Sequence, residues 1–300
     1  LLVEPVLRAL KKKYINAKIT MYTGDSRGSK DIVQYFETKP DNIIPIPENS
    51  ITQDLLYGQK GFDLRFDLDL AYESRKMVNY IDAYFETCGF EEKVEEINGE
   101  LSVLKYVDKN EKVPRLVYEK DRMIKEKYVA VELFGSNWPS KQFNDQLRWS
   151  PILKKIKELN YKIVFLSNIN PIREIADFIN ENNDFNTLLN YTKYSSFYIG
   201  VDGGSFHISQ AFNLPALVIN GGALSNLTSY SEKVEIIKNN ELICLGCKHR
   251  QFYNDDGRGG ITFVNRCELP KETEYRCMKN LTESYILNEL EKFLIKYSLK

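Results

Sequence analysis

The sequence predicts an α/β chain built from two domains. Segments of strand-like apolar residues alternate with segments of helical periodicity along both halves of the chain. The chain has 300 residues, of which 43% are hydrophobic and 28% charged, which is enough apolar material for two cores and too much for a disordered chain. Short glycine-containing turns follow several of the predicted strands. In the second half the β-α-β-α-β order predicts a parallel, doubly wound sheet.

The first half opens with an amphipathic helix. Pro5 suits the first helical turn, Val6, Leu7 and Leu10 share one face, and three lysines follow at the negative end of the helix. The next segments are, in order, a strand over 18–23, a helix over 32–36, a short strand over 43–46, an alternating apolar and charged run over 62–70, and a helix over 76–85. Residues 91–125 are charged and weakly periodic, so we expect the interdomain region there.

The second half carries stronger strand signals. The predicted elements are, in order, a strand over 128–134, a helix around Pro151, a strand over 162–166, a helix opened by Pro171 over 172–179, a strand over 196–201, a helix from Ser205, a strand over 215–219, and a long amphipathic C-terminal helix over 285–294. The Thr282-Glu283-Ser284 segment before the last helix suggests a capping box.

Charge and hydropathy exclude several classes of protein. Lys and Arg total 41 against 42 for Asp and Glu, so the chain has no basic field to hold a nucleic acid. No stretch reaches the length of apolar sequence that spans a bilayer, and the start resembles neither a signal nor a transit peptide. We therefore expect a cytoplasmic protein, with peripheral association at the inner membrane as an alternative. The chain begins at Leu1 rather than Met, which suggests that a segment precedes it.

A glycine turn follows the predicted strand over 196–201. Gly203 and Gly204 leave room for a phosphate, and Ser205 offers a hydroxyl and an amide at the start of a helix. Asp202 would orient the turn or accept from a ligand hydroxyl, and His207 would lie in the first helical turn. The alternative is a tight structural turn in which the histidine is only a cap or a packing residue.

A second candidate follows the strand over 128–134. Ser136, Ser140 and Lys141 lie on the connection that leaves this strand, at the same edge of the predicted sheet as the glycine turn. A lysine there would suit a diphosphate. The alternative is that Lys141 is a solvated loop charge. The absence of a Walker-type loop argues against a P-loop nucleotidase.

Four of the five cysteines have the spacing of a metal site. Cys244 and Cys247 form a two-residue-spaced pair, and Cys267 and Cys277 follow in one later segment. The polar, glycine-rich loop between them has too little apolar surface to order itself, so we expect a structural metal, zinc or iron. Two disulfides and unligated packing cysteines are the alternatives. Cys88 stands alone and is interpreted as a small buried hydrophobe.

Together these segments resemble the family 9 glycosyltransferases, the bacterial heptosyltransferases of GT-B fold. The segment over 201–212 is similar to the family's aspartate-x-glycine-x-x-histidine motif, Ser140-Lys141 is similar to its serine-lysine, and the segment over 5–11 is similar to its first N-terminal helix. The resemblance is firm from about residue 128 and weaker between residues 25 and 120.

The resemblance implies a fold and a reaction. The fold would be α/β, GT-B, with two Rossmann-like domains facing a cleft: residues 1–122 on the acceptor side, and residues 123–300 binding the nucleotide sugar. The C-terminal helix would cross back to the N-terminal domain. The reaction would be an inverting transfer of a heptose-like sugar, without a catalytic divalent metal, to a hydroxyl on lipopolysaccharide, another glycan or a protein.

The resemblance also assigns residues. The donor would be held by Ser136, Ser140, Lys141, Asp202, Gly203, Gly204, Ser205 and His207. The family's catalytic aspartate would lie upstream of Leu1, so no base is assigned. The autotransporter heptosyltransferase branch resembles this chain in having a four-cysteine iron finger, here over 244–277, and a homo-oligomer is also expected. The alternative function is a catalytically silent nucleotide-sugar-binding or assembly subunit. A Rossmann-type dehydrogenase is disfavoured because no glycine-x-glycine-x-x-glycine motif follows a strand.

Overall fold

The computed structural model divides the chain into two compact units. One comprises Leu1–Tyr72 and Tyr80–Val117, and the other Glu73–Asn79 and Tyr118–Lys300. The described residues are 1–24, 29–46, 61–68, 71–72, 78–90, 93–97, 100–104, 107–134, 143, 146–169, 172–222, 224–247, 254–255, 261–262, 267 and 269–300. The sequence-based boundary between residues 122 and 123 lies shortly after the start of Tyr118–Lys300.

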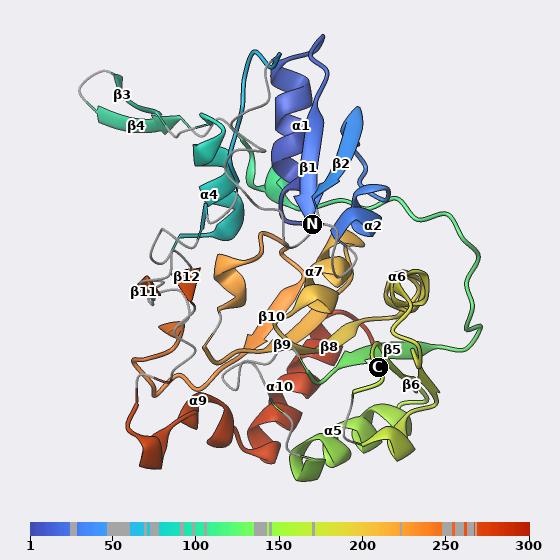
Figure 1. The fold of residues 1–300 in the computed structure, drawn as a ribbon. Helices are drawn as coiled ribbons and strands as arrows, with labels where there is room; N and C mark the ends of the chain where they lie inside the picture. Colours follow the sequence, from blue (N-terminus) through green and yellow to red (C-terminus); the bar gives the residue numbers. More distant parts are fainter. Residues whose placement is uncertain are drawn as a thin grey trace. The chain divides into compact units, whose positions relative to one another are not determined.

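The first unit contains a pair of parallel strands with helices packed beside them (Figure 1). Strand β1 (Thr20–Gly24) pairs with β2 (Asn42–Ile46), and the helices are α1 (Glu4–Lys13), α2 (Ser29–Val33) and α4 (Tyr80–Thr87). Leu7, Val33 and Phe36 form a small apolar cluster. The predicted helix at Pro5 and the predicted strands over 18–23 and 43–46 are therefore present.

The charged segment after α4 contains an antiparallel hairpin that the sequence analysis did not predict. Strand β3 (Lys93–Ile97) pairs with β4 (Glu100–Leu104), and a 3₁₀ turn, η1 (Lys109–Lys112), follows. The segment over 91–125, where the interdomain region was expected, therefore contains a regular hairpin.

The second unit is built on a six-stranded, all-parallel sheet. Its strands are β5 (Tyr128–Glu132), β6 (Lys162–Phe165), β7 (Phe178–Ile179), β8 (Tyr198–Val201), β9 (Ala216–Ile219) and β10 (Val234–Ile237). They lie in the order β10-β9-β8-β5-β6-β7. The chain therefore starts in the centre with β5, winds outward to β7, returns beside β5 with β8 and winds outward on the other side. This is the doubly wound Rossmann strand order. The parallel, doubly wound sheet that the sequence predicted is therefore present.

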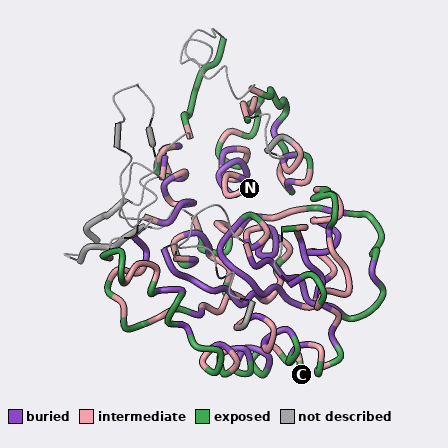
Figure 2. The backbone as a smooth tube through the Cα atoms, turned by 60° about the horizontal axis from the view of Figure 1, so that its bottom comes forward, coloured by how far each residue is buried: buried purple, intermediate pink, exposed green. Residues whose placement is uncertain are grey.

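Helices cover both faces of this sheet (Figure 1). They are α5 (Gln146–Glu158), α6 (Phe185–Lys193), α7 (Gly204–Ala211), α9 (Arg276–Lys279) and α10 (Glu283–Lys296). Val129 and Val131 of β5 share one apolar cluster with α5 and α10, whereas Tyr128 and Ala130 share another with residues of α6 and α7. Figure 2 shows the buried backbone of the strands in the interior of this unit.

Helix α10 belongs to the second unit. Thr282 caps it by accepting a hydrogen bond from the backbone N–H of Tyr285. Its apolar face, with Ile286, Leu290 and Phe293, joins the core formed with α5. The expected crossing of this helix to the N-terminal domain stays a prediction.

One predicted helix is wrong. The segment over 172–179 forms a 3₁₀ turn, η3 (Arg173–Ile175), followed by the edge strand β7. The carboxylate of Asp177 accepts from the backbone N–H of Ile163 at 2.8 Å and thereby fixes the start of this edge strand beside β6. Pairing with the sheet overrides a short apolar pattern that suits either structure.

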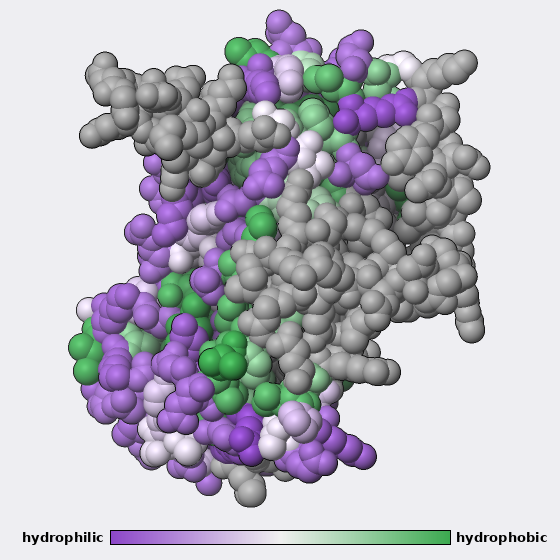
Figure 3. All heavy atoms as spheres, turned by 90° about the vertical axis from the view of Figure 1, so that its left-hand side faces the viewer, coloured by the Kyte–Doolittle hydropathy of each residue, from purple (hydrophilic) through white to green (hydrophobic). Residues whose placement is uncertain are grey.

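The smaller described elements of the second unit lie in its connections. They are η4 (Ser225–Leu227), β11 (Asn254–Asp255), β12 (Ile261–Thr262) and η5 (Lys271–Thr273). Within the described part of the chain, no helix combines the length and hydropathy that a membrane span requires. On the face drawn in Figure 3, polar and apolar residues are interspersed over the described surface.

Candidate functional site

The strand order of the second unit reverses between β5 and β8. These strands are direct neighbours, with Glu132 opposite Gly200. The helix after β5, α5, packs on one face of the sheet, and the helix after β8, α7, packs on the other. In open parallel sheets, ligands bind at the carboxyl ends of the strands at this topological switch point. Both sequence-predicted connections, residues 135–141 and 202–207, leave the sheet there.

The strands at the switch point approach each other closely. A Cβ at Gly200 would lie 2.2 Å from the backbone oxygen of Glu132 and 2.7 Å from the hydroxyl of Tyr198. Because the nearest of these atoms belongs to the backbone of β5, a side chain at position 200 would push β5 and β8 apart. Gly200 therefore fixes the spacing of the two strands that flank the site.

The glycine turn lies directly at this edge. Gly203 is the N-cap of α7 in extended conformation, and Gly204 is the first helical residue. A Cβ at Gly204 would meet no heavy atom within 4 Å, so this residue faces open space. The first N–H groups of a helix lack intrahelical partners, and with the helix dipole they favour an anion. The turn thus has the chemistry of a phosphate site.

Asp202 and His207 come together beside the turn. Asp202 is 2% exposed, and its Oδ1 lies 3.9 Å from Nε2 of His207. The same Oδ1 accepts from the hydroxyl of Thr228 at 3.3 Å. On its other side, His207 Nδ1 lies 3.5 Å from the amide nitrogen of Gln210. These contacts hold Asp202 beside the turn, and its orienting role stays a prediction.

The loop after β9 supports this turn, which the sequence analysis missed. The hydroxyl of Thr228 also donates to the backbone oxygen of Ser225, and the hydroxyl of Ser225 donates to Oδ1 of Asn220 at 2.7 Å. Asn220, directly after β9, is 1% exposed, and its amide nitrogen has no partner among the described residues. A polar chain therefore runs from the end of β9 to Asp202.

Glu132, at the end of β5, is a second buried acid that the sequence analysis did not single out. It is 5% exposed. Its Oε1 accepts from the hydroxyl of Ser167 at 3.0 Å and from the backbone N–H of Phe134 at 3.3 Å. Burial raises the pKa of Glu132 to about 7, although both hydrogen bonds lower it. Its signal in the sequence is a single acid in an otherwise apolar strand.

The three predicted donor residues on the β5–α5 connection, Ser136, Ser140 and Lys141, lie outside the described residues. The description of this connection stops at Phe134 and resumes with Phe143. Their roles stay predictions. The structure therefore brings together Asp202, Gly203, Gly204, Ser205 and His207 from the predicted set.

The four predicted metal ligands share one neighbourhood without forming a ligand group. No cysteine is in a disulfide, which excludes the two-disulfide alternative in this structure. Burial is the main cause that raises the pKa of the Cys277 thiol to about 12, and Cys247, Cys267 and Cys244 raise it in the same direction. The backbone N–H of Tyr275 donates to Sγ of Cys267 at 3.2 Å. Among the described residues, no three His, Cys, Asp or Glu side chains are arranged to hold a metal ion.

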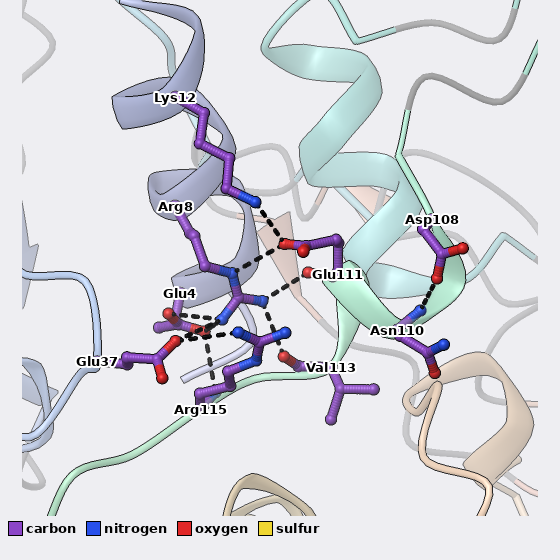
Figure 4. A network of polar contacts seen from close by, with 9 residues as sticks. All are labelled: Glu4, Arg8, Lys12, Glu37, Asp108, Asn110, Glu111, Val113 and Arg115. Carbon is purple, nitrogen blue, oxygen red and sulfur yellow. Dashed lines mark hydrogen bonds and ion pairs between the residues drawn. The ribbon is translucent and has the colours of Figure 1, made fainter. Parts of the chain in front are cut away.

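The first unit contains a buried ion pair (Figure 4). Glu4 is fully buried, and both its oxygens lie 3.1 Å from Nη1 of Arg8. Burial raises the pKa of Glu4, while Arg8 and the backbone N–H of Arg115 lower it. Because the carboxylate is committed to these groups, Glu4 serves structure rather than proton transfer.

The second unit is thus a doubly wound α/β domain with a glycine turn at a helix N-terminus beside its switch point. No family model matches the chain. A curated relative, the autotransporter heptosyltransferase TibC of Escherichia coli O78:H11 (strain H10407 / ETEC), is 23% identical over 208 residues, which cover 65% of this chain. The match spans about half, 49%, of that relative's length.

Solved structures give the same fold. The iron-containing dodecameric glycosyltransferase TibC from enterotoxigenic E. coli H10407 aligns over 99% of this chain and 72% of its own, with a TM-score of 0.64 and 16% identity. A family 9 glycosyl transferase from Veillonella parvula DSM 2008 aligns over 98% and 93%, with a TM-score of 0.62 and 13% identity.

E. coli heptosyltransferase WaaC, solved with ADP-2-deoxy-2-fluoro heptose, aligns over 97% of this chain and 95% of its own, with a TM-score of 0.58 and 11% identity. The chain therefore has the α/β fold of the GT-B heptosyltransferases of glycosyltransferase family 9, and the resemblance found in the sequence is confirmed at the level of the fold.

Proposed function

We propose that this chain binds a nucleotide-diphosphate sugar at the switch point of its second unit and transfers the sugar, heptose-like, to a hydroxyl acceptor. The observation that carries the proposal is the start of α7: an open Gly204 at the helix N-terminus, beside the buried Asp202, where the strand order reverses. TibC has been solved with ADP-D-beta-D-heptose and WaaC with an ADP-heptose analogue, which supports an ADP-sugar as the donor.

The site offers a way to stabilise the leaving diphosphate without a divalent metal. The N–H groups of Gly204, Ser205 and the following residue would face the phosphates, with Lys141 as the cation. Asp202, held by Thr228, would position the turn. We propose inverting transfer and assign no catalytic base. The acceptor is a hydroxyl on lipopolysaccharide, another glycan or a protein.

A Gly204→Ala variant should separate stability from donor binding. Its backbone φ is not in the left-handed region and its Cβ meets nothing, so the fold should be as stable as that of the wild type, or more stable by up to about 1 kcal/mol. A methyl group where a phosphate packs costs about 1–3 kcal/mol, so affinity for ADP-heptose or ADP-glucose should fall about tenfold. Isothermal titration measures the affinity.

The matched control is Gly24→Ala, at another exposed glycine with nothing near its Cβ, which should leave the affinity unchanged. When the donor is present at one hundred times its dissociation constant, it should raise the free energy of unfolding of the wild-type protein by about 2.7 kcal/mol. No stabilisation by any nucleotide sugar would overturn the proposed function. Binding without transfer to any hydroxyl acceptor would favour the catalytically silent subunit. Unchanged affinity in Gly204→Ala, or in Lys141→Ala, would remove that residue from the site.

We also propose that Cys244, Cys247, Cys267 and Cys277 hold a structural metal, iron or zinc. Their spacing, their common neighbourhood and the N–H bond to Cys267 support this, together with the iron in TibC. Four thiolates would fill a tetrahedral site and leave no open position for catalysis. The ion would order the polar loop between Cys247 and Cys267.

Protein purified without added metal should contain close to one equivalent of iron or zinc per chain by elemental analysis. Cys244→Ser should lose most of it, whereas Cys88→Ser, the buried cysteine of the first unit, should retain it. Removing the metal should expose the thiols to a thiol reagent and lower the stability of the second unit. Less than about half an equivalent in the wild type, with all thiols reactive, would rule out the site.

TibC is dodecameric, and we propose that this chain also forms a homo-oligomer, which light scattering on the purified protein measures directly.

A further inference from the structure

Glu132 is a buried acid that pairs with no cation of the described residues. All five residues of β5 are buried, and the other four are Tyr128, Val129, Ala130 and Val131. Within the described part of the chain, Glu132 makes no ion pair, and both side-chain hydrogen bonds go to Oε1. An isolated carboxylate in such a place is costly. A buried acid that is not needed for packing points to a role at the site.

The two hydrogen bonds of Glu132 reach the connections on either side of it. Phe134 begins the β5–α5 connection, which carries Ser136, Ser140 and Lys141, and Ser167 follows the neighbouring strand β6. Oε1 therefore links Phe134, where the predicted diphosphate-binding connection begins, to Ser167 after β6. A change in the charge or position of this carboxyl acts directly on the backbone at Phe134.

Glu132 lies on the α7 face of the sheet. Side chains alternate along β5, and Tyr128 and Ala130 belong to the cluster on that face, so Glu132 shares it. Its partner across the ladder is Gly200, three residues before Gly203. At about 3.3 Å per residue the glycine turn lies about 10 Å further along, and the long side chain shortens this gap.

The titratable groups around Glu132 are few. From β8 the phenol of Tyr198 faces it, and Glu132 and Asp202 both raise the pKa of that phenol, which burial already raises. Beyond Tyr198, Asp202 and His207 lie on the turn and on α7. From the segment after β6, the hydroxyl of Ser167 reaches it. Lys141 lies outside the described residues.

We propose that Glu132 is a positioning residue of the donor site that joins Phe134 after β5 to Ser167 after β6 as a neutral acid, so that the site accepts a doubly negative diphosphate when Glu132 is protonated and disfavours it when Glu132 is ionised. This rests on the proposed function. At roughly 10 Å and an effective dielectric constant of about 20, a carboxylate repels a doubly negative diphosphate enough to weaken binding by more than about a hundredfold without salt, and screening at physiological ionic strength reduces this to about tenfold.

The burial of Glu132 places this change near neutral pH, since the pKa of the carboxyl is about 7. Affinity should therefore fall as pH rises through that value. The two phosphates of an ADP-sugar are both diesters and keep a constant charge over this range, so ADP-glucose is a suitable probe alongside ADP-heptose. A titration of the probe itself does not enter the result.

The experiment measures the dissociation constant of ADP-glucose and ADP-heptose from about pH 5.5 to about pH 8.5. The wild type should bind about tenfold more weakly at the upper limit. Glu132→Gln keeps the acceptor oxygen for Ser167 and Phe134. Its affinity for both sugars should stay constant across the pH range and should exceed that of the wild type at high pH. The control Glu181→Gln removes an exposed carboxylate that pairs with Arg173 and should follow the wild type.

His207 is present in both proteins, so any pH dependence that it causes appears in the wild type and in Glu132→Gln alike. Equal profiles for these two proteins would overturn the proposal. Failure of the wild type to bind either sugar at any pH would instead overturn the proposed function. Circular dichroism of Glu132→Gln at each pH confirms that the variant is folded where its affinity is measured.

Discussion

Arg8→Ala is expected to lower the free energy of unfolding of the first unit by about 3–5 kcal/mol, because removing one member of a buried ion pair leaves the other uncompensated. Arg8 is 5% exposed. Besides contacting both oxygens of Glu4, its Nη2 donates to the backbone oxygens of Glu111 and Val113 at 2.6 and 3.0 Å (Figure 4). One guanidinium thus joins α1 to the segment over 111–113, about one hundred residues later in the chain.

Hydrogen exchange measures this effect where it arises. Backbone amides of α1 should exchange faster in Arg8→Ala, and circular dichroism should show unfolding of the first unit at lower denaturant. Trp149 is buried in the core of the second unit, and the range of the first unit contains no tryptophan, so tryptophan fluorescence reports separately that the second unit is unchanged.

Lys12→Ala is the matched control. Lys12 lies on the same helix and pairs with Glu111 at 3.0 Å, but both side chains are exposed. An exposed pair of this kind contributes about 0–1 kcal/mol. Equal losses in the two variants would contradict the buried-pair explanation. The double variant Glu4→Gln with Arg8→Met should recover part of the loss, because it leaves no unpaired charge.

The layout of the second unit follows from its strands. The segments over 128–134, 162–166, 196–201 and 215–219 are long apolar runs separated by helical patterns, and only a parallel sheet covered on both faces buries such runs. The same logic placed the glycine turn and the β5–α5 connection at one edge. The strand order, which makes that edge a switch point, is not encoded in any local pattern and comes from the structure.

Two elements have recognisable local signals in the sequence. Asn98-Gly99, between β3 and β4, is a dipeptide typical of hairpin turns, but the charged character of the surrounding sequence favoured an interdomain region. Helix α6 has Asp184 as its N-cap, with the side chain accepting from the N–H of Thr187, a start signal that was available in the sequence.

The hydrogen bonds that hold Asp202 in place could not be predicted from the sequence. Asn220, Ser225 and Thr228 are ordinary loop residues in the sequence, and they act on Asp202 only because β9 lies beside β8. Such contacts depend on tertiary neighbours rather than on spacing. Glu132 is an intermediate case, since an acid in an apolar strand is visible in the sequence, but its burial and its lack of a cation are not.

Glu132 should also make the stability of the second unit depend on pH. Its pKa is about 7 in the folded chain and 4.5 without the fold. Between these values the folded state holds the proton that the unfolded state has released, so stability falls as pH rises. The free energy of unfolding falls by about 3 kcal/mol in total between pH 4.5 and pH values above the folded pKa, because each pKa unit corresponds to about 1.4 kcal/mol.

Glu132→Gln removes this dependence, since the amide cannot ionise and still accepts from Ser167 and Phe134. Below about pH 4.5 the variant and the wild type should have equal stability, and above about pH 8 the variant should be more stable by about 3 kcal/mol. Urea denaturation followed by tryptophan fluorescence measures the second unit alone, because Trp149 is fully buried in its core.

Glu181→Gln is again the control, because an exposed carboxylate should give a curve parallel to that of the wild type over the whole range. A constant difference between Glu132→Gln and the wild type from pH 4.5 to pH 8 would mean that Glu132 does not change its charge in this window. A difference that grows with pH, together with a donor affinity that falls with pH only in the wild type, would assign both effects to the same proton. Ionisation of Glu132 would then lower both the free energy of unfolding and the affinity for the donor, because the same carboxyl contacts Phe134 and Ser167 beside the donor site.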